Sequence, residues 1–231
     1  MSRELLAGRT AVVFDFYGTL TPMSPGQAWA ANAARLAEVM GVPADAMSRV
    51  LDDTFPDRIS GTLGGVRQTM QALADRLGIT LSGIQLDDAS RTRRRLQEAM
   101  FSLRPEALKV LARLRQRGLK IGLVSDCTQE LPDAWPRLPL AAAVDAPVFS
   151  CMEGTRKPDP RLFRKVAADL AADPAQCLYV GDGGGDELAG ASSVGMRAVL
   201  LAGPDWHQSG AADRHAAWPG PRISSLTELC S

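Results

Sequence analysis

The chain alternates between short apolar runs and longer segments with helical periodicity. Runs of roughly four to eight residues rich in Val, Ile and Leu are typical of strands buried on both faces of a sheet. The sequence predicts such strands at residues 10–14, 120–125, 177–182 and 196–203. Apolar residues three or four positions apart predict amphipathic helices at residues 106–118, 157–171 and 185–195. This alternation is typical of an α/β fold, with a parallel, Rossmann-like sheet that carries helices on both faces.

The alternation is interrupted after the first strand by a long segment that has helical periodicity alone. Apolar residues recur at helical spacing in residues 26–41, 66–78 and 86–103. We therefore expect an all-helical inserted domain at residues 21–103, and an α/β core domain made of residues 1–20 and 104–231. A last short strand and helix are expected at residues 222–230, and the least structured part at residues 203–221.

Composition excludes several classes of function. The 231 residues include 26 Lys and Arg and 26 Asp and Glu, so no basic field favours a nucleic acid or a membrane surface. The four cysteines form no CxxC pair, and the first residues lack the apolar stretch of a signal peptide, so we expect a cytoplasmic protein. His207 and His215 are the two histidines, which argues against histidine-centred catalysis. We expect a monomer or a homodimer.

Polar side chains follow the predicted strands at the points where these end. Taken singly, each has an ordinary explanation, such as a helix cap or a turn residue. Because the carboxyl ends of parallel strands meet at one edge of the sheet, we expect these side chains to lie close together. Carboxylates grouped with a lysine and a hydroxyl suit a Mg²⁺ ion shared with a substrate phosphate. The residues are Asp15, Ser125, Asp126, Lys157, Asp182 and Asp186.

The glycine-rich turn after residue 180 has a competing interpretation. It lies between a predicted strand and a predicted helix, as a dinucleotide-binding turn does. Asp186 occupies the last glycine position of the G-x-G-x-x-G pattern, and Asp182 would face a pyrophosphate. A dinucleotide site is therefore disfavoured.

Four motifs in order, DFYGTL, VSDC, RKPDP and VGDGGGDE, give the chain a family resemblance. Together they resemble the haloacid dehalogenase-like (HAD) hydrolase superfamily, and the helical insertion resembles the α-helical cap of its first type. The resemblance implies that Asp15 is the nucleophile and a Mg²⁺ ligand. It further implies the backbone carbonyl of Tyr17 and the carboxylate of Asp182 as metal ligands, with Asp186 in support through water or Lys157.

The same resemblance implies the residues that hold the substrate. Ser125 and Lys157 would bind the transferring phosphoryl group, Thr19 would close the first loop, and Asp126 would complete the phosphate-binding set. The expected catalytic residues are Asp15, Tyr17, Ser125 and Lys157. The expected substrate is a small phosphorylated molecule covered by the cap.

Tyr17 departs from the phosphatase pattern, in which a second Asp at this position protonates the leaving alcohol. A tyrosine also follows the nucleophile in the 2-haloacid dehalogenases of the superfamily, which use no metal. Against dehalogenation, Asp182 keeps the metal carboxylate, Phe163 replaces a tyrosine, and Asp126 replaces an asparagine. The sequence thus favours a Mg²⁺-dependent phosphatase, and leaves open a dehalogenase and a weakly active binding protein.

Other residues carry weaker signals. The arginines of residues 91–95 are interpreted mainly as a solvated helix face, with substrate contact as the alternative. Trp29 and Arg35 on the first cap helix could reach the site, although a Trp at helical spacing is more often a core residue. Cys127 is interpreted as a small buried side chain rather than as a nucleophile.

Overall fold

The computed structural model describes residues 2–24, 26–203, 205 and 217–230. Its core is a six-stranded, fully parallel sheet in the order β3-β2-β1-β4-β5-β6. The strands are β1 (Ala11–Phe14), β2 (Lys120–Ser125), β3 (Ala146–Phe149), β4 (Cys177–Gly181), β5 (Arg197–Leu201) and β6 (Arg222–Ile223). The predicted α/β class and parallel sheet are confirmed.

The register of the central strands brings their carboxyl ends to one level. Phe14 of β1 lies opposite Leu123 of β2 and Val180 of β4. Residues one or two positions beyond each of these therefore share one edge of the sheet. This is the edge at which an open α/β sheet binds its ligands.

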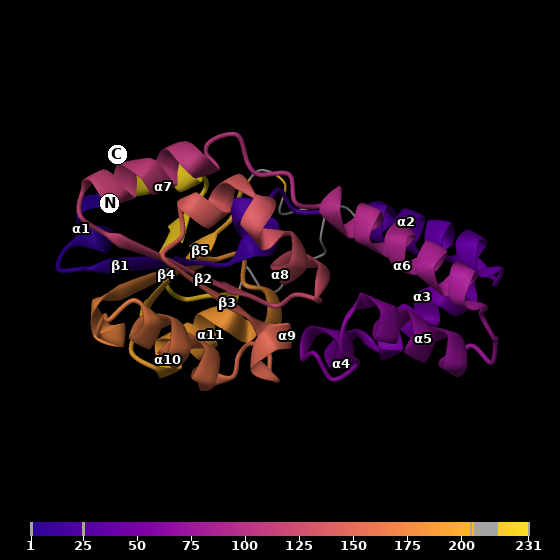
Figure 1. Cartoon of the computed structure of the whole chain (residues 1–231). Helices are drawn as coiled ribbons and strands as arrows, with labels where there is room; N and C mark the ends of the chain where they lie inside the picture. Colours follow the sequence, from indigo (N-terminus) through magenta and orange to yellow (C-terminus); the bar gives the residue numbers. More distant parts are fainter. Residues whose placement is uncertain (1, 25, 204, 206–216, 231) are drawn as a thin grey trace.

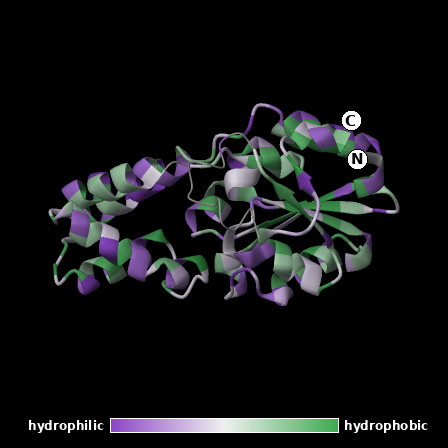
Figure 2. Cartoon of the chain, turned by 180° about the vertical axis from the view of Figure 1, so that it is seen from behind, coloured by the Kyte–Doolittle hydropathy of each residue, from purple (hydrophilic) through white to green (hydrophobic). Residues whose placement is uncertain are grey.

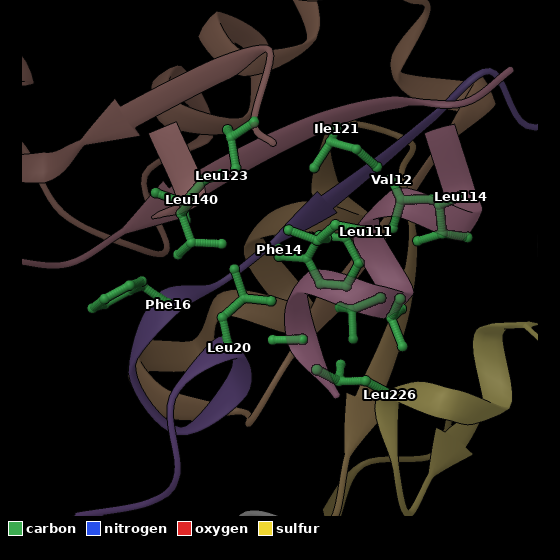
Figure 3. Close-up of a cluster of buried hydrophobic side chains, with 14 of the residues drawn as sticks. Val12, Phe14, Phe16, Leu20, Leu111, Leu114, Ile121, Leu123, Leu140 and Leu226 are labelled. Atoms are coloured by element: carbon green, nitrogen blue, oxygen red, sulfur yellow. The ribbon is translucent and has the colours of Figure 1, made fainter. Parts of the chain in front are cut away.

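Helices cover both faces of the sheet (Figure 1). One face carries α1 (Ser2–Leu6), α7 (Ala107–Gln116) and the terminal turn η7 (Leu226–Cys230); the other carries α10 (Pro160–Asp169) and α11 (Glu187–Ser193). Side chains of β1 alternate between them: Val12 and Phe14 join the first cluster of apolar residues, and Ala11 and Val13 join the second. Figure 3 shows Phe14 packed among Leu111, Leu20 and their neighbours.

The inserted segment forms a separate helical lobe beside the sheet, the cap (Figure 1). Its helices are α2 (Gly26–Met40), α3 (Ala44–Asp53), α4 (Phe55–Ile59), α5 (Val66–Arg76) and α6 (Gly83–Glu98). A capping box between Ser82 and Gln85 starts α6. The cap has its own apolar core, which includes Leu36, Met47 and Met70. Figure 2 shows hydrophilic and hydrophobic residues alternating along these helices and mainly hydrophobic residues along the strands of the sheet.

The two connections between core and cap lie side by side. The amide of Arg104 donates to the carbonyl of Leu20 at 2.8 Å, and Arg104 Nε donates to the Thr19 carbonyl at 2.9 Å. A further contact joins Ser150 Oγ to the carbonyl of Ile59 in α4, at 2.5 Å. The predicted domain limits at residues 20/21 and 103/104 coincide with the hydrogen-bonded pair, and they stay a prediction.

Several elements were not predicted from the sequence. These are strand β3, helix α1, and helices α8 (Glu130–Ala134) and α9 (Ser150–Glu153), with the short turns η2 (Trp135–Arg137), η3 (Pro139–Ala142) and η4 (Pro174–Gln176). Helices α3 and α4 fall within the predicted all-helical insertion but outside its predicted helices. Two further turns, η1 (Phe16–Leu20) and η5 (Gly184–Asp186), lie at the candidate site. Most of the predicted loop at residues 203–221, with His207 and His215, lies outside the described residues. In the described part of the chain, no helix has the length and apolar character needed to span a membrane.

Candidate active site

Asp15 is the first residue after the central strand. Its amide donates to the carbonyl of Val180 at 3.0 Å, which continues the pairing of β1 with β4, and its side chain is buried. The following turn closes through the Thr21 amide, which donates to the Phe16 carbonyl at 3.0 Å. Gly18 has a φ of 79° in this turn, and a Cβ there would lie 2.8 Å from Asp182 Oδ2. The first loop therefore packs directly against Asp182.

A cluster of buried carboxylates surrounds one lysine. Asp15, Asp182 and Glu187 each offer an oxygen within 4.8 Å of the other two. Lys157 Nζ donates to Asp15 Oδ1 at 2.5 Å and also to Glu187 Oε2. Glu187 additionally accepts from the Tyr179 hydroxyl at 2.8 Å and from the Gly183 amide at 2.9 Å. The sheet edge thus gathers side chains from three separate segments of the chain.

Burial and charge set the protonation of this cluster. Burial, and then repulsion by Glu187, raises the pKa of Asp182 to about 7. Burial, opposed by Lys157, also raises the pKa of Asp15. Burial alone would lower the pKa of Lys157, but the charges of Asp15 and Glu187 raise this pKa well above its ordinary value. Lys157 therefore stays an ammonium. Without a further cation, the cluster cannot keep all its carboxylates ionised at neutral pH.

The donor set fits a hard divalent cation. Mg²⁺ prefers oxygen ligands, and buried carboxylates with raised pKa values gain most from a bound cation. Asp15, Asp182 and Glu187 are the described residues that could hold it. The Tyr17 carbonyl, the other ligand implied by the family resemblance, stays a prediction.

Asp186 is not brought to the cluster. It precedes α11 with a φ of 53°, in the left-handed region, and its side chain is exposed. The neighbouring Glu187 is fully buried and reaches Lys157 instead. In the structure Glu187, and not Asp186, is the carboxylate that contacts Lys157 and joins the cluster.

Two buried hydroxyls at the site lack partners. Ser125 Oγ, at the end of β2, and Thr19 Oγ1, in the first loop, are buried and have no hydrogen-bond partner among the described residues. A buried hydroxyl left unpaired is costly, so such groups are expected to meet a ligand. Asp126 Oδ1 accepts from the Lys157 amide at 2.9 Å, which fixes the lysine's loop beside β2. The two unpaired hydroxyls could donate hydrogen bonds to the oxygens of a bound phosphoryl group.

A cavity of about 660 Å³ lies between core and cap. Tyr17, Asp126 and Cys127 line it from the core side. The Tyr17 ring packs edge-on against Phe16 with a centroid distance of 4.8 Å. Burial, and then the neighbouring Cys127, raises the pKa of Tyr17, so its hydroxyl stays neutral.

Most of the chain, including every element of this site, matches one protein family. The family, described as "Hydrolase: haloacid dehalogenase-like hydrolase", matches residues 10–193, which is well over half of the chain. The chain belongs to this hydrolase family. The helical insertion between β1 and β2 corresponds to the cap of its first type.

Relatives of this hydrolase include two kinds of enzyme. Phosphatase MT3486 of Mycobacterium tuberculosis (strain CDC 1551 / Oshkosh) is 30% identical over 206 residues, covering 83% of this chain and 87% of that protein. The (S)-2-haloacid dehalogenase 4A of Burkholderia cepacia is 26% identical over 202 residues, covering 83% and 82%. The structure of a 2-haloacid dehalogenase from Pseudomonas syringae pv. Tomato DC3000 has the same fold, with a TM-score of 0.68, 23% identity and 96% coverage of both chains. Several other curated relatives match over only 36–46% of their own length.

Three buried charged side chains near the site or the cavity were missed by the sequence reasoning. Glu187 starts α11 and Glu130 lies on α8, both in the core, and Arg58 lies on α4 of the cap. Their signals were weak, since each is a single charged residue within a short helix. Arg93 is buried and lines the cavity, whereas its neighbours Arg91, Arg94 and Arg95 are exposed.

The remaining weaker candidates also separate. Trp29 lines the cavity, and Arg35 is an exposed residue paired with Glu38. Cys127 is buried, with its Sγ 4.0 Å from Cys151 Sγ. Burial raises the pKa of Cys127, which keeps it a neutral thiol, as expected for a packing residue.

Proposed function

We propose that this hydrolase is a Mg²⁺-dependent phosphatase that acts on a small phosphorylated metabolite through an aspartyl-phosphate at Asp15. One observation carries the proposal: Asp15, Asp182 and Glu187 lie within 4.8 Å of one another around a single ammonium, that of Lys157. Buried acidic groups in excess of their cationic partner are stable as carboxylates only with an added cation. A phosphatase site supplies that cation together with an anionic substrate.

The chain's own groups account for the remaining requirements of phosphoryl transfer. When bound, Mg²⁺ would reduce the repulsion between the anionic nucleophile and the anionic phosphate and stabilise charge on the transferring group. Ser125 Oγ and Thr19 Oγ1 have unused hydrogen-bonding capacity at the phosphate position. Lys157 Nζ, already bonded to Asp15 Oδ1, holds the nucleophile and leaves Oδ2 for attack.

The reaction would then proceed in two steps. Asp15 Oδ2 attacks phosphorus, the bond from phosphorus to the ester oxygen breaks, and the departing alkoxide takes up a proton. Water then attacks the phosphorus of the aspartyl-phosphate, which releases inorganic phosphate and restores the Asp15 carboxylate. Lys157 and Ser125 stabilise the charge on the phosphoryl oxygens in both steps.

Tyr17 limits the range of esters. General acid catalysis contributes on the order of 10²–10⁴ in rate. The partly buried phenol has a raised pKa and so gives up its proton less readily than a carboxylic acid would. Esters with good leaving groups, which need little protonation, are therefore the better substrates.

Dehalogenation of 2-halo acids is the second candidate, and Tyr17 is the observation that favours it. A halide leaves without a proton, so the missing acid is no handicap, and a dehalogenase is among the relatives. Asp182 weighs against it, since a buried acid with a pKa of about 7 has no use in a site that binds only an anionic halo acid. Phe163 is fully buried against Tyr179, at a ring distance of 5.3 Å, and offers no polar group to the site.

The test combines two substrate classes with two metal conditions. Phosphate release from p-nitrophenyl phosphate and alkyl phosphates, and chloride release from 2-chloropropionate, are measured with Mg²⁺ and with EDTA. We expect phosphate release that EDTA and Asp15→Asn both abolish. Chloride release that persists in EDTA would replace the proposal with dehalogenation. Binding of vanadate with Mg²⁺ but turnover of neither class would indicate a binding protein.

A further inference from the structure

The cap wall of the cavity carries two buried arginines. Arg58 comes from α4 and Arg93 from α6, and both line the cavity that Tyr17 and Asp126 close from the core side. Their exposed fractions are 7% and 5%. Arginines are almost never this deeply buried without a partner, so the partner of each is informative.

Arg93 has its partner within the protein. Its Nε donates to Glu130 Oε1 at 2.6 Å, and Glu130 is itself buried at 4% exposure. Burial opposes the charge of Glu130, but Arg93 holds the pKa of this carboxyl below its usual value. The pair is therefore ionised and neutral overall, and it also joins the cap to α8 of the core.

Arg58 has no such partner. Its Nε donates to Thr54 Oγ1 at 3.2 Å and its Nη2 to the Leu51 carbonyl at 2.6 Å, so its bonded acceptors are uncharged oxygens. It forms no ion pair within the described part of the chain. The same guanidinium stacks over the ring of Phe55, 5.6 Å from its centroid. These contacts fix the position of the guanidinium without neutralising it.

The acidic groups that line the cavity form no ion pair with Arg58 in the described part of the chain. Asp52 lines the same cavity but is exposed, so solvent screens its charge. Asp126 lies on the core side, where it accepts from the Lys157 amide and where burial raises the pKa of its carboxyl. Burial, and then Arg93, lowers the pKa of Arg58 to about 9, which leaves it charged at neutral pH. Glu130 and Asp52 oppose this lowering from a distance, without an ion pair to Arg58. Arg58 is thus a buried guanidinium of the cavity wall that no described ion pair neutralises, and an anionic ligand would pair with it.

The rest of the lining defines what would connect this anion to the reacting phosphate. Side chains of Trp29, Ala33, Leu51 and Ile59 line the same space with apolar surface, and Asn32, Ser48 and Gln97 add a few polar groups to it. A mostly apolar wall with a few polar groups suits a short carbon chain that ends in a polar group. One unmatched guanidinium suits a single carboxylate, because a planar fork binds a carboxylate in a bidentate manner.

We propose that the cavity selects a phosphate monoester that carries a carboxylate on a short apolar carbon chain, with the carboxylate bound by Arg58. The phosphate end would occupy the site of Asp15, Ser125 and Lys157, so the inference rests on the proposed function. Arg93 and Glu130 form the neutral wall beside it.

Binding of phosphonates tests this without turnover. Phosphonoacetate, 3-phosphonopropionate and 4-phosphonobutyrate are compared with ethyl-, propyl- and butylphosphonate, in which a methyl group replaces the carboxylate. Calorimetric titration uses the full chain with Mg²⁺. A charged hydrogen-bonded pair predicts that at least one acid binds about 10- to 100-fold more tightly than its alkyl counterpart. Equal binding of every pair, or binding of neither series, overturns the proposal.

Variants assign the preference to Arg58. In Arg58→Gln, the ratio of acid to alkyl affinity should fall to near one, and Arg58→Lys should restore part of it. Arg94→Gln, on the exposed side of α6, is the matched control and should keep the ratio. A ratio that Arg58→Gln leaves unchanged overturns the assignment. Thermal unfolding verifies that each variant folds. If Arg58→Gln does not fold, the comparison of acid and alkyl phosphonates in the unmodified protein decides whether the cavity prefers a carboxylate.

Turnover separates this inference from the proposed function. If no ester releases phosphate with Mg²⁺, the proposed function fails, while the phosphonate ratios still decide the role of the cavity. If esters with and without the carboxylate bind and react equally, the phosphatase stands and the inference fails.

Discussion

Lys157 and Glu187 are hydrogen-bonded to each other in the interior of the protein, where the side chain of Glu187 is fully buried. Glu187 also accepts from Tyr179 and from the Gly183 amide. One carboxylate therefore ties the glycine-rich turn after β4 to the lysine that holds Asp15. Its role is to position Lys157 and, on the proposed function, to support the metal.

Replacing Glu187 should weaken the site without unfolding it. Glu187→Gln keeps the volume of the side chain but can place an amide NH₂ where Lys157, Tyr179 or the Gly183 amide donates. Of its two described ion pairs, Lys157 then keeps the one with Asp15. Loss of a group that orients metal ligands typically costs about 10–100-fold in metal affinity or activity. We expect a loss of this size in Mg²⁺ affinity, measured by titrating phosphatase activity and the thermal midpoint with Mg²⁺.

The adjacent acid provides the control for this prediction. Asp186 is exposed and has a left-handed backbone that asparagine also tolerates. Asp186→Asn should therefore change Mg²⁺ affinity by no more than about twofold, as expected for a screened surface charge. Equal losses in the two variants would contradict the role given to Glu187.

The pKa of Asp182 predicts how stability depends on pH and Mg²⁺. In the metal-free protein this pKa is about 7, against 3.8 for the free side chain. Between these values the folded state holds a proton that the unfolded state has lost, so stability should fall as pH rises from about 4 to 7. The contribution is on the order of 2–4 kcal/mol. Because a metal ligand must be ionised, the rise in thermal midpoint caused by Mg²⁺ should be small near pH 5 and large near pH 7.5.

Asp182→Asn isolates this contribution. The variant should show a weaker pH dependence of the metal-free midpoint over the same range, and Mg²⁺ should no longer raise the midpoint. Thermal unfolding followed by circular dichroism measures both. A Mg²⁺ effect of the same size at pH 5 and pH 7.5 in the unmodified protein would be inconsistent with Asp182 as a ligand.

The helices and strands with a clear hydrophobic periodicity could be predicted in their order along the chain. Short elements without such a pattern could not. Strand β2 is found at the predicted residues, since its apolar run is uninterrupted. Strand β3 was missed because it has four residues and contains Pro147. Proline lacks the amide that a central strand needs, and β3 is in fact one of the two edge strands of the described sheet. A strand of this kind forms because it pairs with a neighbouring strand, here β2, and not because its own sequence has a clear strand pattern.

The site was predictable as far as strand ends define it. Asp15 and Asp182 follow paired strands and Ser125 is the last residue of one, so the register alone places them at one edge of the sheet. Choosing between Asp186 and Glu187 required the backbone of the turn, where Gly185 has a φ of 58° and Asp186 one of 53°. Arg58 could not be found from the sequence, because its burial depends on how the cap docks over the core.

Gly18 is predicted to be irreplaceable for two separable reasons. Its φ of 79° is unfavourable for any residue with a Cβ, and that Cβ would lie 2.8 Å from Asp182 Oδ2. Gly18→Ala should lower the free energy of unfolding by about 2–4 kcal/mol and weaken Mg²⁺ binding. Gly8→Ala is the matched control, since Gly8 has a φ of 69° but no atom within 4 Å of its Cβ position. Urea unfolding should show about 1 kcal/mol for Gly8→Ala; an equal loss at both glycines would mean that the contact with Asp182 is unimportant.

Tyr17→Asp should change which esters are hydrolysed. The substitution places a carboxylate two residues after the nucleophile, at a position that lines the cavity. Because a carboxylic acid can protonate a leaving alkoxide, turnover of alkyl phosphates should rise relative to p-nitrophenyl phosphate, by up to about 10²-fold. The lost packing of the ring against Phe16 and Phe101 should cost about 2–4 kcal/mol of stability, which thermal unfolding records separately. Tyr17→Asn matches the size and lost packing without the acid, and it should leave the ratio of the two rates unchanged. If Asp and Asn shift that ratio equally, proton transfer to the leaving group is not what Tyr17 limits.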